Sequence, residues 1–282
     1  MKMVETNGAT LATEAFGTSE NGDILLVMGA TASMVAWPET FCRRLAAAGY
    51  RVIRFDHRDT GRSTTNPPGV VAYDVSDLAS DVLAIMDAYG LAACHLVGMS
   101  LGALIGQVLA LEAPQRLRSL TLISAEPLGM PYEGEGISPA FMSHFGSMAS
   151  LDWSDRDAVI GFLLRIAELS AGSAFPFDAK AARAEIERVL SRTASIQSAF
   201  NHSMIAGQID PALRADAIAV PTLVIHGTED PVISPNAART SAAAIAGARL
   251  LLLEGRGHEL AAPDLDHIAD AILALAGARS VS

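Results

Sequence analysis

One stretch of this chain limits its possible folds more than any other: residues 88–111 contain no Asp, Glu, Lys or Arg. By length alone, such a run could span a membrane as a helix. Its pattern changes half-way, however, because Cys94–Met99 is typical of a short buried strand and Leu101–Leu111 of an apolar helix. The joint between them is the sequence GMSLG at positions 98–102. We therefore predict a buried strand, a sharp turn and a helix rather than a membrane span.

Strand and helix patterns alternate along most of the chain. Short apolar runs indicate strands, and segments with a helical apolar stripe follow several of them, such as the helix that Asp74 can cap. This alternation is typical of an α/β fold with a mostly parallel central sheet and helices on both faces. The predicted strands include Asp23–Met28, Arg51–Phe55, Cys94–Met99, Leu117–Ser124, Thr222–His226 and Arg249–Leu253, and the predicted last helix is Asp264–Ala276.

The alternation is interrupted between residues 128 and 212, where strand patterns are hard to find. Helical patterns occur there at Asp155–Leu169 and Ala179–Ala199. We interpret residues 128–212 as a helical cap inserted between two strands of a core that comprises residues 1–127 and 213–282.

Aromatic side chains gather in this predicted cap, which holds six of the nine phenylalanines of the chain. A cap over the edge of an α/β sheet commonly encloses a ligand pocket. We therefore expect Phe141, Phe145, Trp153 and Phe162 to line a pocket for a small hydrophobic substrate. The alternative is that these side chains form only the core of the cap itself, and both roles are compatible.

The joint at 98–102 has the form Gly98-x-Ser100-x-Gly102 between a buried strand and a helix. A serine at such a joint lies on a very sharp turn, which exposes its hydroxyl above the sheet. The positions two residues before and after it approach neighbouring backbone so closely that glycine is needed. The alternative is a glycine-rich loop packed on the sheet. In this context we predict that Ser100 is a nucleophile.

A serine hydroxyl needs a base to accept its proton, and the base needs an acid to orient it. His258 lies between glycines after a predicted strand, whereas His226 ends a strand at its buried portion and His267 lies within the last helix. Asp230 follows the strand that ends at His226, although a turn before Pro231 would also explain it. We predict His258 as the base and Asp230 as the acid, with Glu126 as a rival acid.

The oxyanion of the transition state needs two hydrogen-bond donors. We predict the backbone amide of Leu101, directly after the nucleophile, and that of Ala30, in the loop after the strand Asp23–Met28. The charged loop Asp56–Thr64 lacks the ligand spacing of a zinc or calcium site. We interpret it as a hydrogen-bond network that supports the site, and we expect no metal and no cofactor.

These motifs resemble those of the α/β-hydrolase superfamily, over essentially the whole chain. Val27-Met28-Gly29, Trp37-Pro38 and the segment VIRFDHRDTGRST at 52–64 resemble the aclacinomycin methylesterase-like group, which hydrolyses a methyl ester on an anthracycline. The resemblance implies an α/β-hydrolase fold and a serine esterase with the triad Ser100, Asp230 and His258. It also implies that the residue after the Met-Gly pair donates to the oxyanion, and this residue is Ala30 here.

The sequence thus predicts a carboxylic ester hydrolase that acts through an acyl-enzyme on Ser100. Hydrolysis of a carbon–carbon bond and cofactor-free perhydrolysis use the same triad and stay open. A hydrolase-fold module that binds a ligand without catalysis is a further alternative, although no member of the triad is missing.

Charge and composition limit the partners and the location. The chain has 20 Lys and Arg against 31 Asp and Glu, a net charge of −11, and no large basic cluster. Nucleic acids and anionic membrane surfaces are therefore not expected as partners. The first residues lack the apolar core of a signal peptide, so we expect a cytoplasmic protein with Cys42 and Cys94 reduced and buried. The sequence does not indicate an oligomeric state.

Overall fold

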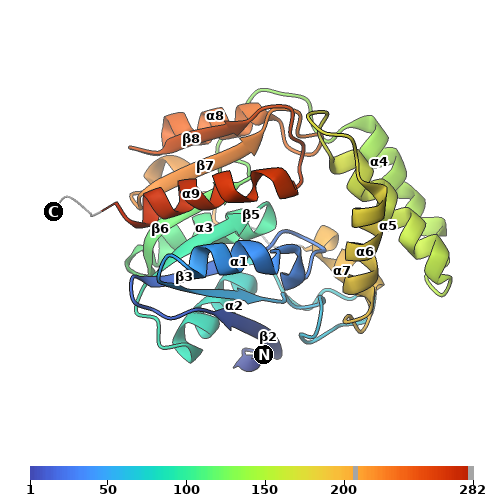
Figure 1. Ribbon diagram of the computed structural model, residues 1–282, viewed down its shortest axis with the longest axis horizontal. Helices are drawn as coiled ribbons and strands as arrows, with labels where there is room; N and C mark the ends of the chain where they lie inside the picture. The colour runs from blue at the N-terminus through green and yellow to red at the C-terminus, as the bar shows by residue number, and fades with distance from the viewer. Residues whose placement is uncertain (206–208, 279–282) are drawn as a thin grey trace.

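The computed structural model describes residues 1–205 and 209–278 (Figure 1). Within these residues, eight strands form a single sheet in the order β1-β2-β4-β3-β5-β6-β7-β8. The pairs β1–β2 and β2–β4 are antiparallel, and all other neighbouring strands are parallel. This confirms the predicted, mostly parallel sheet. The strands are β1 Lys2–Thr6, β2 Ala9–Phe16, β3 Gly22–Val27, β4 Tyr50–Phe55, β5 Cys94–Met99, β6 Leu117–Ile123, β7 Thr222–Gly227 and β8 Arg249–Leu253.

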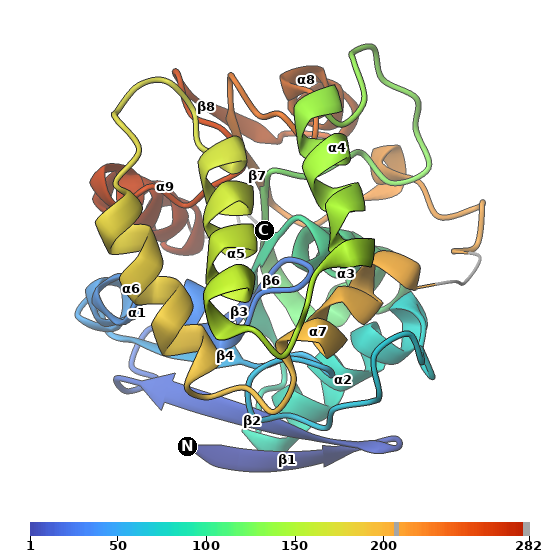
Figure 2. The same ribbon diagram turned by 90° about the vertical axis from the view of Figure 1, so that its right-hand side faces the viewer.

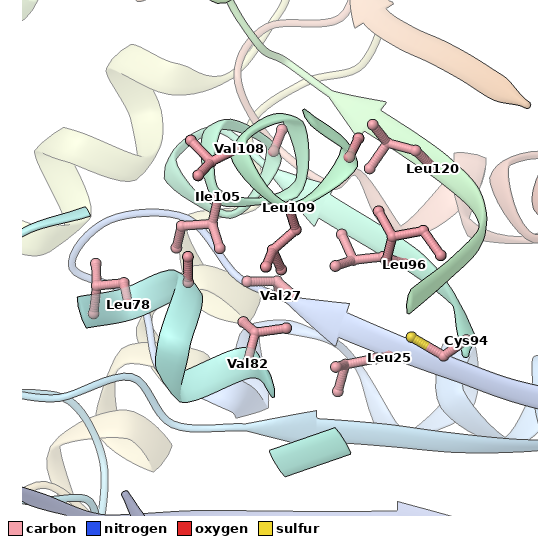
Figure 3. Packing of buried hydrophobic residues seen from close by; sticks show 14 of the residues in the cluster. Leu25, Val27, Leu78, Val82, Cys94, Leu96, Ile105, Val108, Leu109 and Leu120 are labelled. Carbon is pink, nitrogen blue, oxygen red and sulfur yellow. The ribbon is translucent and has the colours of Figure 1, made fainter. Parts of the chain in front are cut away.

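Helices cover both faces of the sheet, as predicted. Because side chains alternate along a strand, Leu25 and Val27 of β3 belong to one apolar cluster, whereas Ile24 and Leu26 belong to another. Helices α2, α3 and α8 pack on the first cluster, part of which Figure 3 shows, and α1 and α9 pack on the second. These helices are α1 Glu39–Ala46, α2 Val75–Ala88, α3 Leu101–Glu112, α8 Pro235–Ala244 and α9 Leu265–Ala276.

The uncharged run forms a central strand and a helix packed closely on it. All six residues of β5 are buried. A Cβ atom at Gly106 of α3 would lie 2.8 Å from a methyl group of Leu120 and 2.9 Å from one of Leu96, so this helix lies close to the sheet. The interpretation as strand, turn and helix is confirmed. Among the residues described, no helix is both long enough and apolar enough to cross a membrane.

A helical insertion lies between β6 and β7, where the cap was predicted. Its helices lie together on one side of the sheet (Figure 1), and α5 lies between α4 and α6 (Figure 2). The insertion begins and ends at one place, because the Ala215 amide donates to the Leu128 carbonyl at 2.8 Å. Residues 206–208 of the predicted range 128–212 lie outside the described residues. The helices are α4 Pro139–Gly146, α5 Arg156–Ser170, α6 Ala179–Leu190 and α7 Ile196–Ala199.

Two features of the insertion differ from the sequence-based expectation. The prediction of a single helix over residues 179–199 is wrong, because α6 ends at Leu190 and a separate helix, α7, begins after Ser195. The Ser195 side chain accepts a hydrogen bond from the Ser198 amide, which caps α7. Helix α4 was not predicted, although Ser138 followed by Pro139 is a helix-start signal, and Ser138 caps it.

Candidate active site

The candidate nucleophile, Ser100, lies at the turn between β5 and α3. Its backbone has φ 50° and ψ −116°, a strained conformation for a residue other than glycine. The Ser100 amide donates to the Ile123 carbonyl at 2.9 Å, which fixes the turn against β6. The side chain is half-buried. The sharp, strained turn predicted from the sequence is therefore present.

The glycines of the motif are required by close packing. A Cβ atom at Gly98 would lie 2.3 Å from the Gly102 carbonyl oxygen, and one at Gly102 would lie 2.1 Å from the Val27 carbonyl oxygen. Both distances are far below a van der Waals contact. A Cβ atom at Gly29 would lie 3.3 Å from the Ser100 Cβ atom. The loop after β3 is thus packed directly beside Ser100.

The candidate acid and base meet at the ends of the last two strands. His258 Nδ1 lies 2.7 Å from Asp230 Oδ2. The other carboxylate oxygen of Asp230 accepts from the amides of Val232 at 2.8 Å and Ile233 at 2.9 Å. The carboxylate is buried, and these contacts fix its orientation. Asp230 can therefore hold the imidazole of His258 in one orientation and stabilise its protonated form.

A second histidine, which sequence reasoning set aside as a base, contacts the same carboxylate. His226 Nε2 lies 2.9 Å from the Ile233 carbonyl oxygen and 3.2 Å from Asp230 Oδ2. Burial opposes the charged form of Asp230, but the hydrogen bonds from His226 and His258 outweigh it and hold the pKa of this carboxyl well below its usual range. The spacing of four residues between His226 and Asp230 was the sequence feature that could have indicated this contact.

The rival acid, Glu126, is placed differently. Its side chain is exposed, and its carboxylate accepts a hydrogen bond from the Tyr132 hydroxyl. Among the residues described, His258 has a hydrogen bond to Asp230 and none to Glu126. The structure therefore brings Asp230, and not Glu126, to the histidine.

Ser100, Asp230 and His258 follow the carboxyl ends of β5, β7 and β8. In the described part of the chain, no hydrogen bond joins the Ser100 hydroxyl to His258. Such bonds are often long in ligand-free sites and shorten only when substrate binds. The protein thus presents an oriented imidazole and a half-buried serine at one edge of the sheet.

The candidate oxyanion donors lie on the two segments beside Ser100. The Leu101 amide belongs to the first turn of α3, where N–H groups have no partner within the helix. The Thr31 amide donates to His202 Nδ1 at 2.9 Å and is therefore occupied. Over residues 1–205 and 209–278, the Ala30 amide has no backbone acceptor. The Ala30 amide is thus compatible with the expected role, and the assignment of Ala30 and Leu101 as oxyanion donors stays a prediction.

The aromatic residues expected in the pocket pack mainly on one another. Phe162 is buried and contacts Trp153 and Phe200, with ring centroids 6.2 and 6.0 Å apart. Phe145 also packs on Phe200, and Phe141 stacks on Phe145. These contacts make them a core of the insertion. That they also line the pocket stays a prediction.

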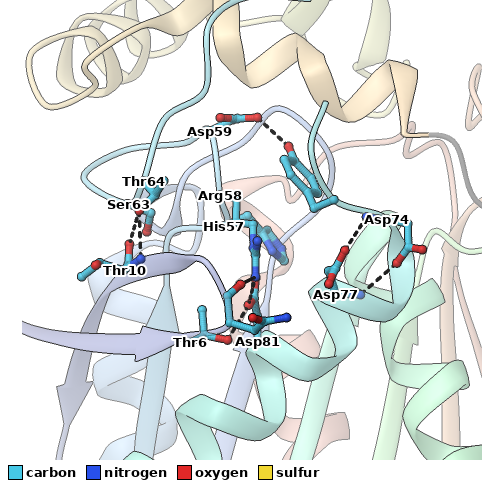
Figure 4. Close-up of polar contacts among 12 residues, drawn as sticks. Thr6, Thr10, His57, Arg58, Asp59, Ser63, Thr64, Asp74, Asp77 and Asp81 are labelled. Atoms are coloured by element: carbon cyan, nitrogen blue, oxygen red, sulfur yellow. Dashed lines mark hydrogen bonds and ion pairs between the residues drawn. The ribbon is translucent and has the colours of Figure 1, made fainter. Parts of the chain in front are cut away.

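The charged loop after β4 forms the expected hydrogen-bond network. Figure 4 shows Arg58 bound to Asp81. The Tyr73 hydroxyl donates to Asp59 at 2.7 Å. Asp59 also accepts from the Asn201 side chain of the insertion at 2.9 Å. Across the residues that the structure describes, no group of three or more His, Cys, Asp or Glu is placed to hold a metal ion.

Comparison with known proteins identifies the family. The sequence model of the alpha/beta hydrolase fold matches residues 24–262. The chain belongs to this family. The hydrolase is 33% identical to rhodomycin D methylesterase of Streptomyces peucetius and 34% identical to that of Streptomyces sp. (strain C5), over 99% of each chain in both cases. A crystal structure of a hydrolase from Pseudomonas aeruginosa is similar, with a TM-score of 0.74, 28% identity and 98% of both chains covered.

These similarities confirm three predictions. The fold and the resemblance to the methylesterase group are those expected from the motifs at 27–29, 52–64 and 98–102. The predicted class of enzyme, a carboxylic ester hydrolase, is also confirmed.

Proposed function

We propose that this hydrolase cleaves a carboxylic ester through an acyl-enzyme on Ser100. The observation that carries the proposal is a strained, half-buried serine after β5 together with the hydrogen-bonded pair of His258 and Asp230 after β8 and β7, because these parallel strands end at the same edge of the sheet. A nucleophile, an oriented base and two amides are the parts that acyl transfer requires.

The reaction proceeds in two halves. His258 takes the proton of Ser100 as its oxygen attacks the ester carbonyl, and the amides of Ala30 and Leu101 bind the oxyanion that forms. The bond to the leaving alcohol then breaks, and His258 gives the proton to that alcohol. Water attacks the acyl-enzyme with His258 as base, and the free carboxylic acid leaves. Asp230 holds the imidazole throughout.

We infer that the substrate is a methyl ester of a hydrophobic, polycyclic compound. Two relatives that match over 99% of their length are named rhodomycin D methylesterase. The aromatic residues of the insertion support an apolar ligand, because the insertion that holds them contacts the candidate triad through the bond from the His258 amide to the Ser170 carbonyl. The steps above require only the ester and water.

The first test compares wild type with Ser100→Ala on p-nitrophenyl esters of increasing acyl length and on aromatic methyl esters. We expect hydrolysis by wild type and a loss of at least about 10³-fold in the variant, because the nucleophile is gone. Circular dichroism checks that the variant is folded. Labelling of Ser100 by a fluorophosphonate without turnover of any ester would favour carbon–carbon bond hydrolysis or perhydrolysis. Neither labelling nor turnover would favour a ligand-binding module.

The acid is tested by Asp230→Asn beside Glu126→Gln. We expect Asp230→Asn to lower kcat by about 10²–10⁴-fold, because the amide no longer stabilises the protonated imidazole. Glu126→Gln keeps the activity within about twofold, since Glu126 is exposed and among the described residues makes no hydrogen bond to the imidazole. Steady-state kinetics on one ester measures both. A larger loss of activity in Glu126→Gln than in Asp230→Asn would assign the acid to Glu126.

A further inference from the structure

Two buried histidines hold the backbone on either side of Ala30. His57 Nε2 lies 2.9 Å from the carbonyl oxygen of Met28. The Thr31 amide donates to His202 Nδ1, also at 2.9 Å. Between these two contacts lie only Gly29, which packs against Ser100, and Ala30, whose amide is the proposed oxyanion donor. The peptide that carries the donor is therefore bound at both ends.

His202 belongs to the insertion, in the short 3₁₀ helix Phe200–Met204. Its Nε2 lies 2.8 Å from the carbonyl oxygen of Arg58. One ring nitrogen thus faces a donor and the other an acceptor, and only the neutral form with hydrogen on Nε2 satisfies both. Burial lowers the pKa of His202 to about 4, and the neighbouring His57 acts in the same direction. The ring is therefore neutral near pH 7.

The two imidazoles also support each other. Their rings pack edge to face with centroids 5.9 Å apart, and Phe55 and Tyr73 pack against His57 and His202 respectively. His57 is buried, and its Nδ1 has no hydrogen-bond partner among the described residues. The polar contact of the His57 ring is thus the hydrogen bond that its Nε2–H donates to the Met28 carbonyl oxygen. Figure 4 shows His57 beside Arg58 in the loop after β4.

Thr31 adopts a conformation that needs such support. Its φ is 65°, in the left-handed region that a β-branched residue rarely enters. A residue in this region persists only where its surroundings hold it. The hydrogen bond to His202 is the contact that anchors the Thr31 amide, and it comes from the insertion rather than from the core.

We propose that His57 and His202 are positioning residues that clamp the loop after β3 and direct the Ala30 amide at the oxyanion. Through His202, the helical insertion then takes part in stabilising the transition state as well as in covering the site. The proposal rests on the proposed esterase function.

Substitution of each histidine by asparagine or glutamine tests the hydrogen bonds of its two ring nitrogens separately. Asparagine places an oxygen near the position of Nδ1, whereas glutamine places an N–H group near that of Nε2. His202→Asn therefore keeps the acceptor for Thr31, and His202→Gln loses it. For His57 the order is reversed, because His57→Gln keeps the donor to Met28 and His57→Asn loses it.

The kinetic expectation follows from this reversal. His202→Gln and His57→Asn lower kcat by about 10- to 100-fold with little change in KM, because a displaced donor acts only in the transition state. His202→Asn and His57→Gln each keep several times more activity than their partner variant. His95→Asn is the control, since this buried histidine bonds to Ser119 away from the loop, and kcat stays as in wild type.

A second readout separates positioning from a purely structural role. A trifluoromethyl ketone forms an adduct with the serine and places an oxyanion in the hole, whereas the matching methyl ketone binds without this step. We expect His202→Gln to lose affinity for the trifluoromethyl ketone alone, by a factor similar to the fall in kcat. Equal losses for both ketones would overturn the proposal.

The Asn and Gln variants at both His57 and His202 allow the test to be decided even where one variant does not fold. If one histidine does not tolerate substitution, the order of the Asn and Gln variants at the other still decides. Equal activity of Asn and Gln variants at both positions overturns the clamp while leaving the esterase function in place. A wild type without Ser100-dependent hydrolysis overturns the esterase function itself.

Discussion

At the scale of single residues, the turn at Ser100 depends on the absence of neighbouring side chains. Gly98 and Gly102 allow α3 to lie against β3 and β5 at distances where any Cβ atom would collide with backbone. Backbone atoms cannot yield as the end of a flexible side chain can. We therefore expect these glycines to tolerate no substitution.

Gly102→Ala tests this expectation against Gly161→Ala. The first variant should cost about 3 kcal/mol or more in free energy of unfolding, or fail to fold, because its Cβ atom meets the Val27 carbonyl. The second should gain up to about 1 kcal/mol, since Gly161 lies inside α5 and a methyl group there would enter open space. Urea unfolding measures both. Equal stability of the two variants would contradict the packing argument.

The residue scale also shows what sequence can predict. Ser100 and its glycines were predictable because a strand, a turn and a helix adjacent in the chain require them. Asp230 and His258 followed from their places after strands. The role of His202 was not predictable, because it depends on contacts with Thr31 and Arg58 that exist only once distant segments have packed.

At the scale of elements, the insertion is fixed to the core on two sides. Near the end of α5, the Ser170 carbonyl accepts from the His258 amide at 2.8 Å, and the Ala174 amide donates to the Gly255 carbonyl at 2.9 Å. On the other side, Arg192 forms two hydrogen bonds of 2.8 Å with the fully buried Asp56. These contacts were not predictable from the helical patterns, which located α5 and α6 but missed α4 and the break at Ser191.

Arg192→Leu and Arg165→Leu compare a buried ion pair between the insertion and the core with an exposed pair within the insertion. Arg192→Leu leaves the carboxylate of Asp56 buried, with the amides of Met34 and Arg62 as its remaining donors among the residues described, so we expect a loss of about 3 kcal/mol. Arg165 pairs with Glu168 on the surface of α5, and its loss should cost less than about 0.5 kcal/mol. Urea unfolding again gives both values, and a small effect at Arg192 would show that the pair contributes little.

At the scale of the whole molecule, buried neutral histidines make stability depend on pH. Burial lowers the pKa of His57, His95 and His202 to about 4. In the unfolded chain, each titrates near its ordinary value of about 6.5. Between these two pH values the unfolded chain binds more protons than the folded protein. The contribution of these histidines to the free energy of unfolding is therefore fully present above pH 6.5 and is lost as the pH drops towards 4.

We expect a steep loss of stability over this window, on the order of 3 kcal/mol for one histidine such as His57. Urea midpoints measured from pH 7.5 down to pH 4.5 give the slope. His95→Asn keeps a partner for Ser119 and removes one titrating group, so its slope should be shallower than that of wild type. A stability that stays flat down to pH 5 would contradict the prediction.

The common starting and ending point of the insertion has a consequence for recombination. Because Leu128 and Ala215 are hydrogen-bonded neighbours, a foreign insert could be spliced at this point without rerouting the core strands. Exchange of such inserts would change the residues over the site while the core strands stay as they are. The exchange would also remove Arg192 and His202, which the core does not replace. Chimeras should therefore approach the wild-type kcat only when the incoming insert brings its own acceptor for the Thr31 amide, so the core strands tolerate the exchange but the oxyanion donor restricts it.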